Sequence, residues 1–179
     1  SSCDDTAAAV LDNTRILSSV LTCQDSIHAE FGGVVPELAS RKHLQAIHPM
    51  VQKALQQANV ALCDIDLIAA TQGPGLIGSL LVGFSYAKAL AHVANIPLVG
   101  VDHMAGHILS VFLGDEQPAF PYIALIVSGG TSSIFLAEGG VHQRGELPEA
   151  MPEFTLPRGQ DLMGLVDVLV RCGLAPSKT

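Results

Sequence analysis

Two histidines in one short stretch, His103 and His107, have the side-chain type and the spacing to bind a metal ion. They follow a β-branched run over residues 98–101, which predicts a buried strand, and they open a predicted helix over 103–113. Residues at this spacing project from the same face of a helix, so both imidazoles can reach one divalent ion. The pair does not complete a metal site. Either a third ligand comes from elsewhere, or these are two surface histidines.

Two turns near the start of predicted elements could present groups to a ligand. Residues 1–6 form a polar turn with Asp4 and Asp5, which face either a phosphate or metal, or only solvent. Residues 72–79 read Gln-Gly-Pro-Gly-Leu-Ile-Gly-Ser and join a predicted strand over 66–71 to a predicted helix over 80–93. Such a turn leaves backbone N–H groups free for an anion, although tight helix–strand packing explains the glycines equally well.

A third candidate is a hairpin with a cluster of hydroxyl groups. The predicted strand over 121–127 ends in Ser-Gly-Gly-Thr-Ser-Ser at 128–133, and a second strand over 134–137 follows. Backbone donors and hydroxyl groups converge in such a turn, which suits a phosphate; a plain tight β-turn is the alternative.

The elements that position these turns alternate between strands and helices. Further strands are predicted over 7–11 and 16–22, a long helix over 36–59, and an amphipathic helix over 161–172. His43 and His48 lie in the long helix, where we expect both to face solvent. Because the chain opens on a loop, we expect its amino terminus to be truncated.

Composition agrees with a single α/β domain. Of 179 residues, 49% are hydrophobic and 4% aromatic, a profile of buried strands and Ala-rich helices. The net charge of −8 argues against a broad basic face that holds nucleic acid unaided. The four cysteines form no C-x-x-C pair, so we expect reduced thiols in a cytoplasmic protein, and we expect neither a signal peptide nor a membrane span.

Five ordered motifs, at residues 2–6, 32–41, 72–76, 103–107 and 127–130, together resemble one family. They resemble the tRNA threonylcarbamoyladenosine transferases, once labelled O-sialoglycoprotein endopeptidases. The resemblance implies an actin-like fold of the sugar kinase/Hsp70/actin superfamily (RNase H-like), with a mixed sheet flanked by helices. Residues 1–146 would form the first lobe without its N-terminal strand, and 147–179 would be an unmatched remnant or rearranged start of the second.

The resemblance also implies an activity. The family transfers a threonylcarbamoyl group from its adenylate to the adenosine next to the anticodon of ANN-decoding tRNAs, with the help of a metal. It implies one iron or zinc ion on His103 and His107, and threonylcarbamoyl-adenylate or ATP as ligand. Its partners would be tRNA, a paralogous actin-like scaffold subunit and a small ATPase subunit, with no membrane. The substrate-binding residues that it implies are Ile126, Val127, Ser128, Gly129 and Gly130.

The chain departs from the family pattern in three places. Asp5 stands where the family usually has Glu, Thr131 stands where it usually has His, and the match ends near residue 146. Because the family's third metal ligand, an aspartate, belongs to the second lobe, we expect the 179-residue chain alone to be inactive.

Three other functions compete with this interpretation. A non-catalytic scaffold subunit of the same fold would have no need for the two histidines. A zinc protease would need a glutamate directly after His103, where the chain has Met104. The segment 32–41 argues against a sugar kinase or an Hsp70-like ATPase.

Overall fold

The computed structural model describes residues 1–114, 116–127, 132–137 and 154–155. The chain divides into two compact units, Ser1–Gln117 and Pro118–Thr179. The helix predicted over 161–172 lies outside the described residues.

The strands of the first unit form two separate ladders. β1 (Thr6–Asp12) pairs antiparallel with β2 (Arg15–Thr22), and β3 (Ile68–Gly73) pairs parallel with β4 (Leu98–Asp102). The α/β class is as predicted, but the strands do not form one mixed sheet within the part of the chain that the structure describes. A cavity of about 720 Å³, lined by residues of both β1 and β3, separates the two ladders.

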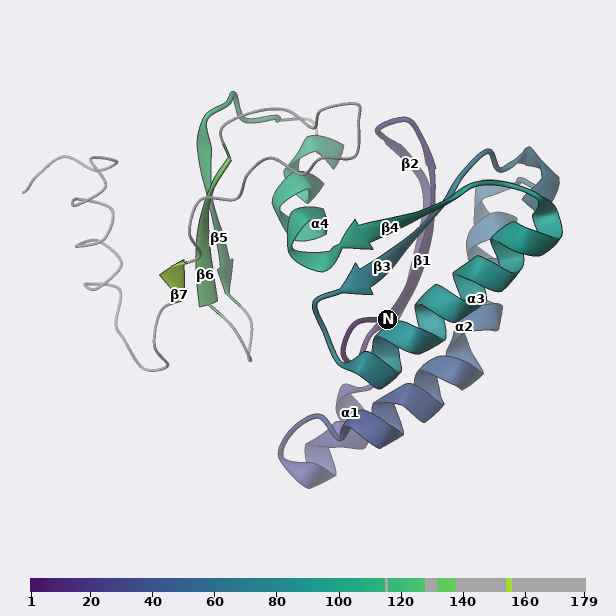
Figure 1. Cartoon of the computed structure of the whole chain (residues 1–179), viewed down its shortest axis with the longest axis horizontal. Helices are drawn as coiled ribbons and strands as arrows, with labels where there is room; N and C mark the ends of the chain where they lie inside the picture. The colour runs from purple at the N-terminus through teal and green to yellow at the C-terminus, as the bar shows by residue number, and fades with distance from the viewer. Residues whose placement is uncertain (115, 128–131, 138–153, 156–179) are drawn as a thin grey trace, which may run out of the picture. The chain divides into compact units, whose positions relative to one another are not determined.

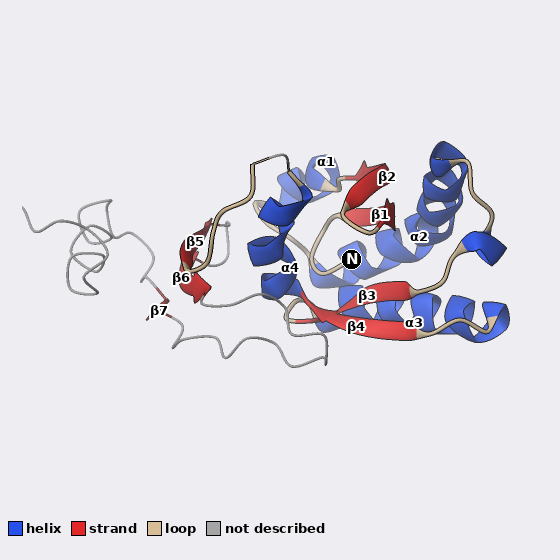
Figure 2. Cartoon of the chain, turned by 90° about the horizontal axis from the view of Figure 1, so that it is seen from above, coloured by secondary structure: helices blue, strands red, loops and turns tan. Residues whose placement is uncertain are grey.

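Two long helices cover the strands of this unit. α2 (Pro36–Ala58) and α3 (Ile77–Ala94) run side by side beneath the two ladders (Figures 1 and 2). α2 begins with Pro36, whose fixed φ suits a first helical position, and both helices end at an asparagine in the left-handed conformation, Asn59 and Asn95. The shorter helical segments are α1 (Asp25–His28), η1 (Ala29–Phe31), η2 (Leu62–Asp64), α4 (His103–Leu109) and η3 (Ser110–Leu113).

A small apolar core joins the antiparallel ladder to α2. Val10 of β1 and Val20 of β2 are buried against Ala54 of α2. The alternation of buried and exposed residues along β1 and β2 follows the period of two expected for a sheet with one covered face. This packing fixes the direction in which β1 leaves the polar turn at its start.

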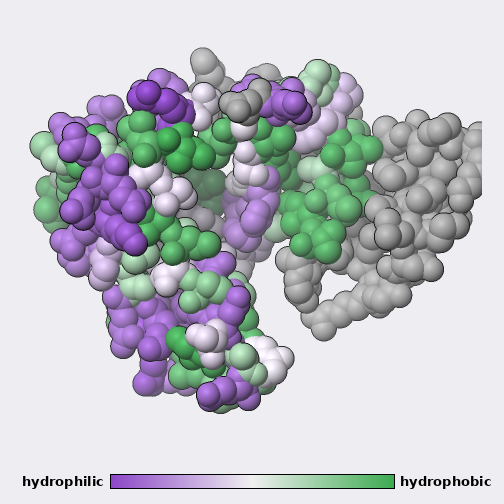
Figure 3. Space-filling view, turned by 180° about the vertical axis from the view of Figure 1, so that it is seen from behind, coloured by the Kyte–Doolittle hydropathy of each residue, from purple (hydrophilic) through white to green (hydrophobic). Residues whose placement is uncertain are grey.

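α3 is long and apolar enough to cross a membrane by length and composition, which the sequence analysis did not anticipate. In the fold, this helix packs against β3 and against α2. This packing covers only part of the helix, since 22% of the 18-residue window is buried. Figure 3 shows hydrophobic side chains reaching the surface in patches among hydrophilic ones.

The second unit contains the predicted hairpin. β5 (Tyr122–Val127) pairs antiparallel with β6 (Ser132–Ala137), with Val127 opposite Ser132, and β6 pairs with the short β7 (Phe154–Thr155). The hairpin was predicted correctly because its two apolar runs flank a glycine-containing turn.

Candidate functional site

The two histidines predicted to bind a metal do face one another. The Nε2 atoms of His103 and His107 lie 3.2 Å apart, and the rings meet edge to face with their centroids 4.5 Å apart. Two imidazoles on one tetrahedral zinc, each about 2.0–2.1 Å from the metal, would hold their nitrogens about 3.3 Å apart. The pair is therefore already spaced for one shared ion.

The start of α4 is fixed by the residue that precedes it. The Oδ1 atom of Asp102 accepts hydrogen bonds from the backbone N–H groups of Met104 and Ala105, both at 2.9 Å. This N-cap satisfies two donors that the helix itself cannot pair. It sets the rotation of α4 at the end of β4, and so directs the two histidines to a common side.

The surroundings favour a neutral His103. Partial burial lowers the pKa of His103 below its ordinary value of 6.5, the neighbouring His107 lowers it further, and Asp102 opposes them. A metal binds the neutral imidazole, so the lowered pKa of His103 is compatible with a ligand role.

Three segments far apart in the sequence meet at this end of the first unit. Gly73, where β3 ends, is the register partner of Asp102, so the glycine-rich turn and α4 leave neighbouring parallel strands at the same edge. The turn also contacts the chain start, since Leu76 donates its backbone N–H to the carbonyl oxygen of Ser2 at 2.8 Å. The acidic turn, the glycine-rich turn and the histidine helix thus form one cluster of loops.

Side chains of α2 and α3 hold the backbone of the acidic turn (residues 1–6) by hydrogen bonds. The carbonyl oxygen of Cys3 accepts a hydrogen bond from His43 Nε2 at 2.9 Å and another from the hydroxyl of Ser79 at 2.8 Å. The side chains of both donors are fully buried. Asp4 is half-buried and Asp5 is exposed, so both residues of this firmly held turn are accessible to solvent.

The cysteines nearest to this cluster are poor nucleophiles at neutral pH. Burial and the neighbouring Asp4 raise the pKa of the Cys3 thiol to about 11. A hydrogen bond with Asp25, together with Asp5, raises the pKa of Cys23 to about 11 as well. Because the thiolate is the reactive form, neither side chain suits covalent catalysis.

Not all of the predicted site residues can be placed in this cluster. Ile126 is half-buried and Val127 is exposed at the end of β5, in the second unit. Ser128, Gly129 and Gly130 lie outside the described residues. Among the residues that the structure describes, no group of three or more His, Cys, Asp and Glu side chains could hold a metal ion, so the third ligand is not identified.

One expectation for α2 was wrong. His48 is exposed as predicted, but His43 is fully buried and is part of the contact that holds the acidic turn. Helical spacing could have shown that His43 lies on the same face as Ala39 and Ile47, both of which are buried.

Comparisons with known proteins show what this chain is similar to. Residues 15–154 match the family model described as TsaD: tRNA N6-adenosine threonylcarbamoyltransferase. Proteins of that name from Desulfotalea psychrophila and Desulforapulum autotrophicum are 66% and 57% identical over 139 and 136 residues, which is 77% and 75% of this chain. The chain spans only 40% and 41% of their length. The solved structure titled YeaZ from Pseudomonas aeruginosa is also similar, with 27% sequence identity and a TM-score of 0.54. The match covers 87% of this chain and 65% of the YeaZ chain.

Proposed function

Because the chain belongs to the tRNA N6-adenosine threonylcarbamoyltransferase family and has its actin-like fold, we propose that the protein transfers a threonylcarbamoyl group to tRNA. The donor would be threonylcarbamoyl-adenylate, and the acceptor the amine of the adenosine next to the anticodon of ANN-decoding tRNAs. The single observation that carries the proposal is the pair of facing Nε2 atoms of His103 and His107, within a cluster of loops suited to phosphate.

The donor set suits a divalent ion such as zinc or iron. Two neutral imidazoles at this separation would supply two ligands, which leaves room for a third protein ligand and for substrate. Such an ion would polarise the carbamoyl carbonyl and offset the charge of the phosphate.

The rest of the cluster would bind and orient the adenylate. The glycine-rich turn over residues 72–76 gives a backbone without bulky side chains beside α4, where a nucleotide could approach closely. The amine of adenosine needs to be placed in line with the carbamoyl carbon rather than activated by a protein nucleophile. The raised pKa values of Cys3 and Cys23 are consistent with direct attack by that amine.

Binding of tRNA would depend on partner subunits. The net charge of −8 gives the chain little capacity to attract a polyanion by itself. The family implies a paralogous actin-like subunit and a small ATPase subunit, and we propose that the paralogue docks on α2 and α3.

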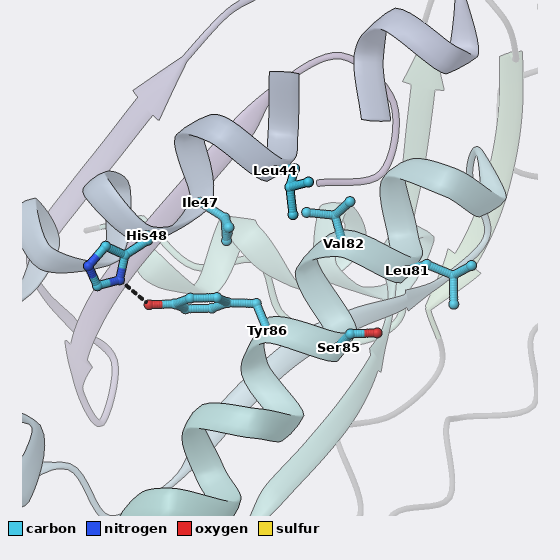
Figure 4. A pocket seen from close by; sticks show the side chains of 7 residues that line it. All are labelled: Leu44, Ile47, His48, Leu81, Val82, Ser85 and Tyr86. Atoms are coloured by element: carbon cyan, nitrogen blue, oxygen red, sulfur yellow. Dashed lines mark hydrogen bonds between the residues drawn. The ribbon is translucent and has the colours of Figure 1, made fainter. Parts of the chain in front are cut away.

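An apolar groove between these helices supports that docking site. Figure 4 shows Leu44 and Ile47 of α2 facing Val82 and Tyr86 of α3, and the groove also includes His48, Leu81 and Ser85. Leu44 and Leu81 are 69% and 57% exposed, so both side chains are accessible to a partner at this groove. The hydroxyl of Tyr86 lies 2.8 Å from His48 Nδ1 and ties the two helices together at the groove. A subunit with the same fold would present helices of its own, and these could pack into the apolar groove between α2 and α3.

A tRNA modification assay tests the proposed function. The full-length protein, supplied with partners and with an enzyme that forms threonylcarbamoyl-adenylate, should modify an ANN-decoding tRNA. Replacement of both His103 and His107 by alanine should abolish the modification. The 179-residue chain should be inactive because it supplies only two identified ligands. Full activity of the double variant would refute the role of the histidines, and a full-length protein without activity would favour a scaffold.

A further inference from the structure

The buried His43 is one member of a hydrogen-bonded chain that runs from the loop before α2 to the acidic turn. Val35 N–H lies 3.3 Å from His28 Nδ1, and His28 Nε2 lies 3.3 Å from Gln24 Oε1. The amide nitrogen of Gln24 lies 3.4 Å from His43 Nδ1, and His43 Nε2 lies 2.9 Å from the Cys3 carbonyl oxygen. Gln24, His28 and His43 are all buried.

The direction of each hydrogen bond can be worked out independently from both ends. Val35 N–H can only donate, so a neutral His28 accepts at Nδ1 and donates from Nε2 to the Gln24 oxygen. The Cys3 carbonyl can only accept, so a neutral His43 donates from Nε2 and accepts at Nδ1. The His28 end places the oxygen of the Gln24 amide toward His28, which leaves the amide nitrogen near His43 Nδ1 and the Ala39 carbonyl oxygen, at 3.4 and 3.5 Å. The single lone pair of His43 Nδ1 accepts mainly from the hydroxyl of Thr6, which is the nearer donor at 2.7 Å.

His43 therefore holds the acidic turn on both sides of Asp4 and Asp5. His43 bonds the carbonyl of Cys3, directly before Asp4, and the side chain of Thr6, directly after Asp5. Ser79 of α3 provides the second hydrogen bond to the same carbonyl. No buried side-chain polar atom in the described part of the chain is left without a partner, so this network is complete as it stands.

We propose that His43, as the neutral Nε2–H tautomer, is the positioning residue that fixes the backbone of the acidic turn, and with it the positions of Asp4 and Asp5, beside the glycine-rich turn. The inference rests on the proposed function for its effect on catalysis, but not for its effect on the turn itself. His43 has no path to a ligand because it is fully buried, and it acts only through the backbone that it holds.

The position of the turn can be measured without any activity, because Cys3 reports on it. In full-length protein whose other cysteines are replaced by serine, alkylation of Cys3 by iodoacetamide should be slow. His43→Leu should accelerate it by about tenfold, the factor expected for one lost hydrogen bond. Ser79→Ala should accelerate it too, and His43→Gln less than His43→Leu, since a glutamine amide can still donate to the Cys3 carbonyl. His92→Gln, a change at an exposed histidine of α3, is the matched control and should have no effect.

These variants separate the inference from the proposed function. Unchanged alkylation in folded His43→Leu would overturn the inference; if that variant does not fold, unchanged rates in Ser79→Ala and His43→Gln would overturn it.

Imidazole ¹⁵N NMR of the unmodified protein should show a neutral His43 protonated at Nε2 at pH 7, and a charged ring or an Nδ1–H tautomer would also refute the inference. In the tRNA assay, His43→Leu should lower kcat by about 10- to 100-fold, with partial rescue in His43→Gln. Faster alkylation in a full-length protein that lacks transferase activity would uphold the positioning role and refute the proposed function. Faster alkylation with unchanged kcat would limit the role of His43 to structure and overturn the inference.

Discussion

Gly75 lies against the backbone of Ser2, so closely that a β-carbon built on Gly75 would lie 2.5 Å from the Ser2 carbonyl oxygen. That carbonyl already accepts the hydrogen bond from Leu76 N–H. The glycine therefore allows the glycine-rich turn and the acidic turn to be in contact, and any larger residue must push the two apart.

We expect Gly75→Ala to destabilise the first unit. The added methyl group meets backbone rather than a flexible side chain, so relief requires a shift of one turn, at about 1–3 kcal/mol of unfolding free energy. Gly33→Ala is the matched control, because a β-carbon there meets no atom within 4 Å. Chemical denaturation of both variants measures the difference, and equal stability of the two would contradict the close approach.

The buried His43 should make stability depend on pH. Burial is the main cause that lowers its pKa below 6.5, while the Cys3 carbonyl, Asp4 and Asp5 oppose it. The unfolded chain therefore binds a proton near pH 6.5 that the folded chain does not bind, and the free energy of unfolding should fall as pH drops below 6.5. The slope from one such group is at most about 1.4 kcal/mol per pH unit.

Denaturation at pH 8.0 and at lower pH should show this loss in the parent protein and a flatter dependence in His43→Gln. Glutamine does not titrate, so the variant should be less stable at high pH but should lose less on acidification. A parallel loss in both proteins would assign the pH dependence to other groups.

The sequence predicted what depends on neighbouring residues and missed what depends on distant ones. The strand before His103 and the helix that begins at His103 depend on local sequence, and both were predicted correctly. The burial of His43 depends on Cys3 and Thr6, which lie 40 and 37 residues away. The separation of the strands into two ladders likewise depends on which edges meet in space, a matter that periodicity along a single strand does not address.

Metal content should depend on both histidines of α4. The full-length protein should bind about one zinc or iron ion per chain. The double change His103→Ala and His107→Ala should abolish this binding, because it removes both imidazole ligands. Elemental analysis after dialysis measures the content, with His92→Gln as a control at an exposed histidine of another helix. Undiminished metal in the double variant would show that the ion binds elsewhere.

Association with the paralogous subunit should depend on the groove between α2 and α3. Leu44→Asp and Leu81→Asp each place a charge on an apolar surface that is exposed in the free chain, so they should weaken binding by at least tenfold without lowering the melting temperature. Val93→Asp is a control, since Val93 is 82% exposed at the end of α3 and does not line the groove. Titration calorimetry with the purified subunit measures affinity, and wild-type affinity in both leucine variants would place the interface elsewhere.

The full-length protein should not cleave glycoproteins, despite the two histidines at the spacing found in zinc proteases. In those enzymes a glutamate directly after the first histidine takes the proton from the attacking water. Here that position is Met104, whose thioether is at most a weak acceptor and whose backbone N–H is bonded to Asp102. Incubation with a heavily glycosylated substrate and added zinc should therefore give cleavage no faster than in buffer. Cleavage that depends on zinc and disappears in His103→Ala would show instead that another group acts as the base at this metal site.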